Sequence, residues 1–213
     1  MIDIIIADDH PVVRHGIKQI LVAESDISVV AEASNAQELL EKIDALDCDV
    51  VLLDISMPGR GGLDVLSELR RTSPKLPVLI LSVHSEDQFG MRVLKAGAAG
   101  YMNKETAPDE LVKAIKMVAS GHKYISPSLA EKLAANLAPA HERAAHQVLS
   151  DREYQVMCLL ASGKTVGEIG RELHLSTKTI STYRARILQK MNLKTNAQLT
   201  FYAVQNALVS AAN

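Results

Sequence analysis

Three aspartates follow two short apolar runs early in the chain. Asp8 and Asp9 come directly after residues 4–7, and Asp54 comes directly after residues 50–53. Short continuous apolar runs with polar ends are typical of strands buried on both faces of a parallel sheet. Because ligand sites in such sheets lie beyond the carboxyl ends of the strands, we expect the three carboxylates to meet at one edge.

Carboxylates this close repel one another, so the site needs a cation. Mg²⁺ suits it, because this ion binds one or two carboxylates together with phosphate oxygens and water. Ser82 follows the apolar run 77–81 and Lys104 lies just past the run 98–102, and both side chains can bind phosphate. A carboxylate can also attack a phosphoryl group and become an aspartyl-phosphate. Each residue alone is a common turn residue, but all five at successive strand ends predict a Mg²⁺-dependent phosphoryl site.

The order of these residues along the chain resembles the receiver domain of two-component response regulators. The resemblance implies that Asp54 accepts a phosphoryl group from a phosphohistidine on a sensor histidine kinase. It also implies that Asp9 binds Mg²⁺ directly and Asp8 mainly through water. Asp54 and the main-chain carbonyl of Ser56 would be the further protein ligands of the ion.

The same resemblance assigns roles to three residues at the later strand ends. Ser82 and Lys104 would contact the phosphoryl oxygens. Tyr101 would turn inward when the Ser82 hydroxyl moves. That shift would rearrange the surface around residues 86–96 and 108–120 and favour dimerisation or free the DNA-binding half. The alternative for Tyr101 is a half-buried strand tyrosine with no switching role.

Length and composition indicate two domains with mainly aliphatic cores. The chain has 213 residues, of which 47% are hydrophobic and 3% aromatic. No apolar run approaches the length of a membrane span and no secretory signal is apparent, so we expect a cytoplasmic protein without membrane contact. Cys48 and Cys158 are expected to be small buried side chains, reduced in that compartment. His10, beside the acid pair, is given no role.

Amphipathic segments alternate with the strand-like runs across residues 1–120. Five strands alternating with five helices predict a doubly wound parallel α/β sheet of flavodoxin-like order 2-1-3-4-5. We therefore expect a receiver domain at 1–120, a linker at 121–148 with a short helix at 129–137, and an all-α helix-turn-helix domain at 149–213. The predicted helices of the first domain are 11–23, 35–44, 62–71, 86–96 and 108–120.

The charges divide the chain in the same place. Residues 1–120 contain 12 Lys and Arg against 19 Asp and Glu, a net charge of -7. Residues 121–213 contain 11 Lys and Arg against 6 Asp and Glu, a net charge of +5. An acidic half joined to a basic half indicates separate partners, with nucleic acid as the candidate for the basic half.

From residue 150 the pattern becomes helical. Ser150 and Glu153 form a predicted capping box, and Gly163 is a natural stop for the first helix. A second short helix is predicted at 166–173, and a third, capped by Ser176, runs to about residue 192. Two short helices joined by a brief turn, the second one basic, match helix-turn-helix geometry.

A helical wheel of the third helix separates a core face from a basic face. Ile180, Ile187 and Met191 lie within about 20° of one direction and are predicted to be core. The stretch 176–194 carries five Lys and Arg and no acid, so its opposite face is a candidate for contact with DNA; the alternative is a solvated face. The predicted DNA-binding residues are Lys178, Thr179, Ser181, Thr182, Arg184, Arg186, Gln189 and Lys190.

Several short motifs of this half resemble the LuxR-type DNA-binding domain. They are LSDRE at 149–153, ASGKT at 161–165, Glu168-Ile169 and LSTKTI at 175–180. With the receiver, they make the chain similar to the NarL/FixJ family of response regulators. This implies double-stranded promoter DNA as a partner and a homodimer on paired half-sites. Residues 178–191 further resemble the BvgA/EvgA branch, although Ser181 and Tyr183 replace the Lys and His common in the family, so base preference cannot be transferred.

Other functions and surfaces stay open at this point. An aspartyl-phosphate phosphatase would also use a strand-end aspartate with Mg²⁺, but it usually needs a general-acid aspartate where this chain has Ser56. A protein acting by contact alone would dock its basic half on an acidic partner and bind no DNA. We expect no enzyme activity beyond the chain's own Mg²⁺-dependent phosphoryl transfer. The last helix, at 197–208, is either a dimer surface or the lid of its domain core.

Overall fold

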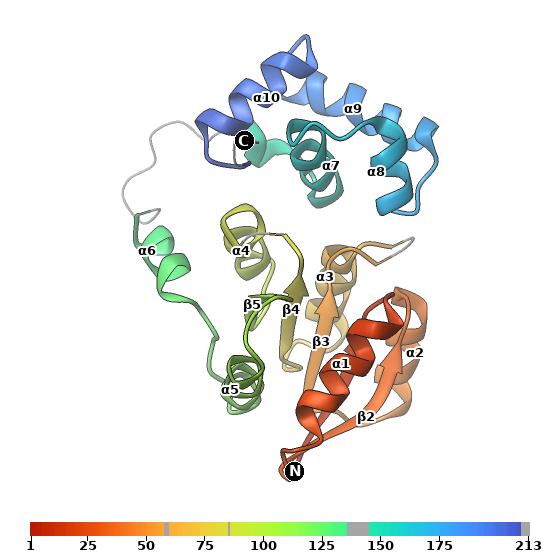
Figure 1. Cartoon of the computed structure of the whole chain (residues 1–213), viewed down its shortest axis with the longest axis vertical. Helices are drawn as coiled ribbons and strands as arrows, with labels where there is room; N and C mark the ends of the chain where they lie inside the picture. The colour runs from red at the N-terminus through yellow and green to blue at the C-terminus, as the bar shows by residue number, and fades with distance from the viewer. Residues whose placement is uncertain (58–59, 85, 136–144, 210–213) are drawn as a thin grey trace. The chain divides into compact units, whose positions relative to one another are not determined.

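The computed structural model of the protein describes residues 1–57, 60–84, 86–135 and 145–209. They divide between Ala130 and Glu131 into two compact units, each described by itself. In the first unit five strands alternate with five helices, and a sixth helix begins at its end (Figure 1). The strands are β1 (Ile2–Ala7), β2 (Ile27–Ala33), β3 (Val50–Asp54), β4 (Val78–Ser82) and β5 (Gly100–Asn103). The helices are α1 (Pro11–Leu21), α2 (Ala36–Ala45), α3 (Gly62–Thr72), α4 (Glu86–Lys95), α5 (Pro108–Ala119) and α6 (Pro127–Ala135).

The five strands form one parallel sheet in the order β2-β1-β3-β4-β5, which confirms the predicted order. Ala7 on β1 pairs with Leu53 on β3, and Asp54 on β3 pairs with Leu81 on β4. Since Asp8 follows Ala7, the carboxyl ends of β1 and β3 lie side by side. This is the edge at which ligands bind in sheets of this type.

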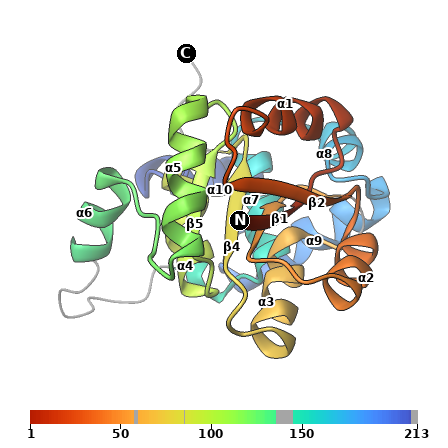
Figure 2. The same cartoon turned by 90° about the horizontal axis from the view of Figure 1, so that it is seen from below.

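Helices cover both faces of the sheet, with α1 and α5 on one side and α2, α3 and α4 on the other (Figure 2). Ile4 and Ile6 of β1 belong to a core cluster with Ile17 of α1 and Ile115 of α5. All residues of β3 and β4 are buried, as their continuous apolar runs predict. Each such aliphatic side chain contributes roughly 1.5–3 kcal/mol by leaving water, so the cores do not depend on aromatic residues.

Helix α3 begins very close to the end of β3. A Cβ atom on Gly62 would lie 2.2 Å from the Asp54 main-chain oxygen and 2.8 Å from Ile55 Cα. Gly62 N also donates a hydrogen bond to the Ile55 oxygen at 3.0 Å. Glycine is therefore required where the chain leaves Asp54 and starts the helix.

The first part of the expected linker packs with the first unit. Tyr124 N donates to the Ala99 oxygen at 2.9 Å, and Tyr124 forms a bridge with Gly100 beside β5. Leu129 is 1% exposed and lies against Gly90 of α4. Helix α6 begins at residue 127 rather than 129, because proline suits the first turn of a helix. Residues 136–144 of the expected linker lie outside the described residues.

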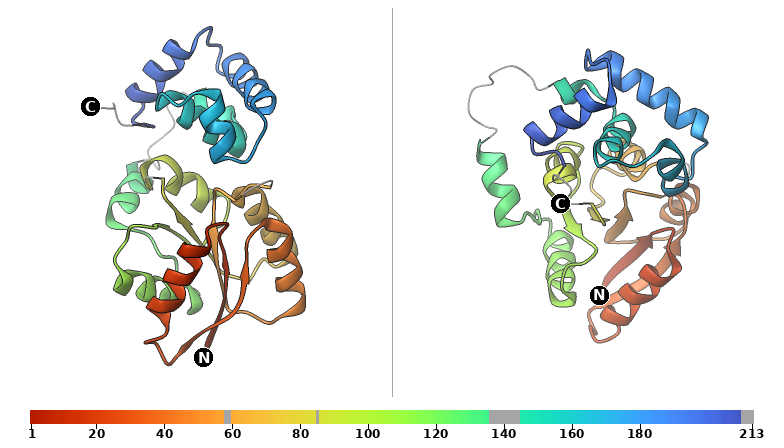
Figure 3. Two further views of the ribbon diagram at one scale, coloured as in Figure 1. Left: turned by 45° about the vertical axis from the view of Figure 1, so that its right-hand side comes forward. Right: turned by 45° about the horizontal axis from the view of Figure 1, so that its top comes forward.

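The second unit is a helical bundle (Figure 3). Ser150 and Glu153 make the predicted capping box at its first α-helix, and Thr165 and Glu168 make another at its second. Ser176 caps the third, as predicted. The elements are the 3₁₀ helix η1 (Ala145–Val148) and the helices α7 (Asp151–Ala161), α8 (Val166–Glu172), α9 (Thr177–Lys190) and α10 (Asn196–Gln205).

The structure corrects one prediction about the cysteines and settles the role of the last helix in its domain. Cys158 is buried as expected, but Cys48 is only half-buried because it lies in the turn before β3, between two aspartates. Leu199 and Ala203 of α10 are buried and close the core of the second unit, whereas Phe201 is 64% exposed. None of the helices in the described ranges is long and apolar enough to cross a membrane.

Candidate functional site

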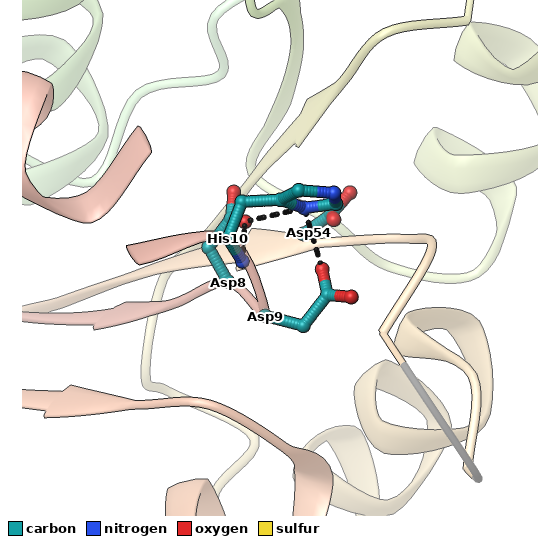
Figure 4. Close-up of side chains that lie close together, drawn as sticks. All are labelled: Asp8, Asp9, His10 and Asp54. Carbon is teal, nitrogen blue, oxygen red and sulfur yellow. Dashed lines mark hydrogen bonds and ion pairs between the residues drawn. The ribbon is translucent and has the colours of Figure 1, made fainter. Parts of the chain in front are cut away.

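Asp8, Asp9 and Asp54 meet at the carboxyl edge of the sheet, together with His10 (Figure 4). One ligand atom of each residue lies within 4.8 Å of the corresponding atoms of the others. Asp8 and Asp54 are 1% and 2% exposed, so two of the three carboxylates are shielded from water. The convergence of the acids that the strand pattern predicted is therefore present.

Main-chain groups orient the buried acids. Asp8 Oδ1 accepts a hydrogen bond from His10 N at 2.9 Å, and Asp54 Oδ1 accepts one from Ser56 N at 3.1 Å. In each case the second carboxylate oxygen, Oδ2, is left to face the other acids and Lys104. The backbone thus fixes which oxygen of each acid is available to a ligand.

Lys104 reaches the acids from the loop after β5. Its Nζ lies 2.6 Å from Asp8 Oδ2 and 2.9 Å from Asp54 Oδ2, and its side chain is 10% exposed. Burial alone would lower the pKa of Lys104, but the charges of Asp54 and Asp8 outweigh it and raise that pKa above its usual value. One ammonium group is therefore shared by two buried carboxylates.

The charge of Asp54 is poorly compensated. Burial raises the pKa of its carboxyl group, and the charge of Asp8 raises that pKa further, although the Lys104 amine opposes both effects. The net result is a pKa above the ordinary aspartate value of 3.8. A buried carboxyl group with a raised pKa beside like charges is typical of a functional site.

The donor set fits a hard divalent cation. Asp8 Oδ2 and Asp54 Oδ2 are buried, and in the described ranges neither accepts a hydrogen bond of ordinary geometry, despite the short distances to Lys104. Two buried carboxylates that share one ammonium group still leave negative charge uncompensated, and uncompensated buried charge is unfavourable. Several carboxylate oxygens at one edge are the ligands that Mg²⁺ prefers. A ligand role for the Ser56 carbonyl stays a prediction.

Two residues of this edge were missed by sequence reasoning. Arg14 of α1 donates to the Asp8 main-chain oxygen at 2.6 Å and to Glu32 of β2 at 3.1 Å, so it holds the turn that carries the acid pair. His10 Nδ1 lies 2.8 Å from Asp9 Oδ1. Both residues lie within six positions of the acids in the sequence, but that proximity alone does not tell such a contact from a solvated side chain.

Ser82 and Tyr101 meet at the main chain of His84. Ser82 is fully buried, and its Oγ accepts a hydrogen bond from His84 N at 3.1 Å. The Tyr101 hydroxyl donates to the His84 oxygen at 2.8 Å, and Tyr101 is only 1% exposed. Tyr101 is therefore more buried than the half-buried alternative assumed, because this carbonyl satisfies the hydroxyl while the core covers the ring. Burial raises the pKa of Tyr101, and its role as a switch stays a prediction.

In the second unit, α9 has the predicted core face. Ile180 and Ile187 are fully buried and Met191 is 5% exposed. The turn before α9 is tight, since a Cβ atom on Gly170 would lie 2.8 Å from the Leu175 oxygen. Helices α8 and α9 are thereby held in the close arrangement of a helix-turn-helix.

The other face of α9 carries two kinds of cation. Lys178 and Arg186 are exposed, and in the described part of the chain no ion pair or side-chain hydrogen bond holds them. By contrast, Arg184 Nε donates to Asn196 Oδ1 at 2.7 Å. The second kind of cation is therefore already engaged within the domain.

Lys190 belongs to the engaged kind. Its Nζ lies 2.7 Å from Glu153 Oε2, the same oxygen that accepts the Ser150 N–H of the capping box. Glu153 is 3% exposed, which sequence reasoning missed because a capping glutamate is normally at the surface. Leaving such a buried carboxylate unpaired is unfavourable, so Lys190 is held to the fold.

The polar uncharged residues of α9 differ in the same way. Gln189 is exposed, and in the described residues its side chain makes no hydrogen bond. The hydroxyls of Ser181 and Thr182 donate to main-chain oxygens one turn earlier, at 2.9 Å and 3.0 Å. Thr179 Oγ1 lies 2.8 Å from the oxygen of the capping Ser176. These hydroxyls still have lone pairs that can accept hydrogen bonds.

Comparisons with known proteins match the two units separately. Residues 4–116 match the response regulator receiver domain, and residues 147–203 match the bacterial regulatory proteins of the luxR family. Response regulator UvrY of Escherichia coli (strain K12) is 38% identical over 212 residues, which is 99% of this chain and 97% of that protein. Response regulator GacA of Pseudomonas aeruginosa is 38% identical over 214 residues, which is 100% of both chains.

A solved structure is similar over nearly the whole length. It is RcsB from Salmonella enterica serovar Typhimurium bound to promoter rprA in the presence of phosphomimetic BeF3-. The TM-score is 0.65 at 30% sequence identity, covering 94% of this chain and 97% of that one. These relatives do not test the resemblance of residues 178–191 to the BvgA/EvgA branch, which stays a prediction.

Proposed function

This chain belongs to the NarL/FixJ family of two-component response regulators, which are phosphorylation-controlled DNA-binding regulators of transcription, and from that premise we propose which residues carry each step. Asp54 accepts a phosphoryl group from a sensor histidine kinase. One observation carries the assignment: Asp54 Oδ2 is buried 2.9 Å from Lys104 Nζ, within the cluster that also holds Asp8 and Asp9.

In the transfer, an oxygen of the Asp54 carboxylate attacks the phosphorus of the kinase phosphohistidine. The P–O bond forms as the P–N bond breaks, and the leaving imidazole takes up a proton. The Lys104 amine and the Ser82 hydroxyl bind the oxygens of the transferred group. Because Lys104 already contacts Asp54 and Asp8, it needs little movement to reach a phosphoryl group on Asp54.

Asp8, Asp9, Asp54 and the main-chain carbonyl of Ser56 are the proposed protein ligands of Mg²⁺. When bound, the ion supplies positive charge that offsets the negative charge of the phosphoryl oxygens. The raised pKa of Asp54 and the buried Oδ2 atoms support a cation at this edge. Main-chain donors hold the Oδ1 atoms of Asp8 and Asp54 and so keep the Oδ2 atoms directed into the site.

We assign DNA binding to α9. Lys178 and Arg186 bind backbone phosphates, because they are exposed and uncommitted, and Gln189 is placed to reach base edges. Thr179, Ser181 and Thr182 contribute as acceptors. Arg184 and Lys190, which the wheel also assigned to DNA, act first as supports of the domain. The proposed location is the cytoplasm, because the promoter DNA that the protein binds is found there.

A homodimer is the proposed DNA-binding form, since paired half-sites match a two-fold protein. Helix α10 offers the surface for it, because Phe201 is 64% and Val204 41% exposed while the opposite face of the helix closes the core. Phosphorylation of Asp54 acts on the surface around α4 through Ser82 and Tyr101, which both contact the main chain of His84 just before that helix.

The assignment of Asp54 is tested with the purified chain, Mg²⁺ and a small phosphodonor such as acetyl phosphate. Mass spectrometry should detect one HPO₃ adduct on the wild type, and Asp54→Asn should abolish it, because an amide cannot form the acyl phosphate. Asp64→Asn is the matched control, since Asp64 is an exposed aspartate on the neighbouring helix. An adduct that survives in Asp54→Asn would overturn the assignment.

Two further assays, turnover of a small phosphoester and recovery of genomic DNA fragments, separate this function from its alternatives. A phosphatase would release phosphate from many turnovers of a small phosphoester, whereas the proposed regulator retains one phosphoryl group per chain. A protein acting by contact alone would retain no genomic DNA fragment under any condition, with or without the phosphodonor. Recovery of specific fragments that increases with the phosphodonor supports the regulator.

A further inference from the structure

The loops after β4 and β5 are joined by the side chain of Asn103. Asn103 Nδ2 donates to the His84 main-chain oxygen at 3.3 Å, and Asn103 Oδ1 accepts the Glu105 N–H at 2.8 Å. Ser82 and Asn103 are paired across the two strands, so the bridge starts where that pairing ends. One short side chain thus contacts both loops that leave the sheet at this edge.

The orientation of the Asn103 amide follows from its partners. A main-chain N–H can only donate, so the atom that faces Glu105 must be the amide oxygen. The amide nitrogen then faces His84, whose main-chain oxygen can only accept. Both hydrogen bonds are therefore satisfied with the same rotamer, which makes the bridge specific for asparagine.

The two ends of the bridge carry the two groups that bind the phosphoryl oxygens. His84 N donates to Ser82 Oγ at 3.1 Å, so the position of the His84 peptide sets the position of the hydroxyl. On the other side, Lys104 lies between Asn103 and Glu105 in the chain. Tyr101 supplies a second donor to the same His84 oxygen, at 2.8 Å.

We propose that Asn103 is a positioning residue that holds the Ser82 hydroxyl and the Lys104 amine at the spacing of one phosphoryl group. This inference rests on the proposed function and extends it to a residue outside the acid cluster. Asn103 touches neither the acids nor the phosphoryl group; it acts through His84 and Glu105. Its loss should weaken binding of the phosphoryl group and leave binding of Mg²⁺ to Asp8, Asp9 and Asp54 unchanged.

The test uses the full chain and beryllofluoride, an unreactive mimic of the phosphoryl group, followed by ¹⁹F NMR at saturating Mg²⁺. Asn103→Ser keeps an acceptor for the Glu105 N–H but is too short to reach His84, whereas Asn103→Ala loses both contacts. We expect both variants to bind beryllofluoride about tenfold more weakly, as the loss of a hydrogen bond worth about 1.4 kcal/mol would produce. Mg²⁺ affinity, measured by calorimetry, should stay within roughly twofold of the wild type. Mutations at sites that do not interact usually change each other's effect by no more than this.

A double-mutant cycle with Tyr101→Phe adds a second readout. Tyr101 and Asn103 donate to the same oxygen, so each compensates in part when the other is removed. The double variant should therefore lose more affinity for beryllofluoride than the product of the two single losses. Glu105→Gln is the matched control, because it keeps the main-chain N–H and changes only the neighbouring side chain.

The outcomes distinguish this inference from the function on which it rests. No binding of beryllofluoride to the wild type would remove the proposed function itself. If the wild type binds and Asp54→Asn does not, the function stands, and the bridge is decided by the Asn103 variants. If Asn103→Ser binds beryllofluoride with wild-type affinity, Asn103 is only a turn residue and the inference is wrong. If the variants lose Mg²⁺ affinity to the same extent, Asn103 supports the fold of the whole site and does not position the phosphoryl-binding groups.

Discussion

The carboxyl edge of the sheet and the exposed face of α9 both gather charged side chains, but the surrounding protein treats those charges differently. At the sheet edge, Asp8 and Asp54 are nearly inaccessible to water and share a single amine. On α9, Lys178 and Arg186 stand in solvent with no partner in the described residues. The excess negative charge of the first region is buried, whereas the excess positive charge of the second is exposed to solvent.

The difference explains how each region responds to a ligand. In the buried region, a cation or a phosphoryl group changes interactions that water does not screen, so a small addition has a large local effect. In the exposed region, a phosphate replaces counter-ions, so affinity is spread over several contacts and falls with salt. The proposed switch and the proposed DNA-binding surface need these opposite arrangements of charge.

The largest expected effect comes from adding one methyl group beside the sheet edge and one to α8, the helix that precedes α9. Gly62→Ala should destabilise the protein by about 3 kcal/mol or more, because the new Cβ would lie 2.2 Å from the Asp54 main-chain oxygen. Gly167→Ala, inside α8, should be neutral or stabilising by about 0.5–1 kcal/mol, because the new atom meets nothing within 4 Å. Thermal and urea unfolding of both variants measure the difference.

Equal destabilisation by the two changes would contradict the contrast in packing. Gly170→Ala is the control within α8, because its Cβ would lie 2.8 Å from the Leu175 oxygen. We expect it to behave like Gly62→Ala although it is only three residues from Gly167.

The next test compares the exposed cations of α9, unpaired within the described residues, with Lys190, which is paired with Glu153. Lys178→Ala or Arg186→Ala should weaken promoter binding and reduce the slope of log affinity against log salt by about 0.9, the value of one phosphate contact. Lys190→Ala should lower the free energy of unfolding by about 1 kcal/mol, since it leaves Glu153 without its ammonium partner; the figure is modest because the lysine is 43% exposed. Its salt slope should stay that of the wild type.

Gel shifts over a salt series and unfolding curves for all three variants measure both quantities. Glu172→Gln gives a control for surface ion pairs, because Glu172 pairs with Lys164, whose side chain is 40% exposed, and loss of this pair should matter little. A reduced salt slope in Lys190→Ala would return that residue to the DNA-binding set.

The smallest expected effect is the pH dependence of stability that arises from the buried Asp54 carboxyl group at the sheet edge. The pKa of Asp54 is raised in the folded state, so the folded state holds this proton more tightly than the unfolded state does. Stability from this group is therefore present at low pH and is lost as the pH rises from about the ordinary value of 3.8 through the raised pKa. Asp54→Asn cannot ionise and should escape that loss, so its melting temperature should rise relative to the wild type between pH 4 and pH 7.

Thermal melts in EDTA over this pH range measure the effect, and Mg²⁺ should reduce it by stabilising the ionised wild type. Lys104 limits the size of the effect, because it keeps Asp8 as a partner when Asp54 is removed. A variant that becomes progressively less stable than the wild type as the pH rises would contradict the raised pKa.

The sequence was sufficient for features that depend on local pattern. Apolar runs predicted β1 and β3, and the acids after them predicted the cluster, because neighbouring parallel strands end at the same edge. The wheel predicted the burial of Ile180 and Ile187 from helical spacing alone. The caps of α7 and α9 followed from residue type.

Contacts between side chains distant in sequence were not predictable in this way. Lys190 and Glu153 are 37 residues apart, and Asn103 and His84 are 19 apart. Their meeting depends on helix packing and strand register, which periodicity does not encode. The same reason explains why half-burial of Tyr101 stayed open as an alternative, since the carbonyl that satisfies its hydroxyl belongs to another strand end.

The bridge between Tyr124 and Gly100 has a practical consequence for dividing the protein. β5 is one of the two edge strands of the sheet, and the segment around Tyr124 lies along its free side. A truncation at residue 120 would uncover that strand and the part of α4 at Gly90 against which Leu129 packs, and unpaired strands invite association between molecules. An isolated receiver ending after Ala130 should stay monodisperse where the shorter one aggregates.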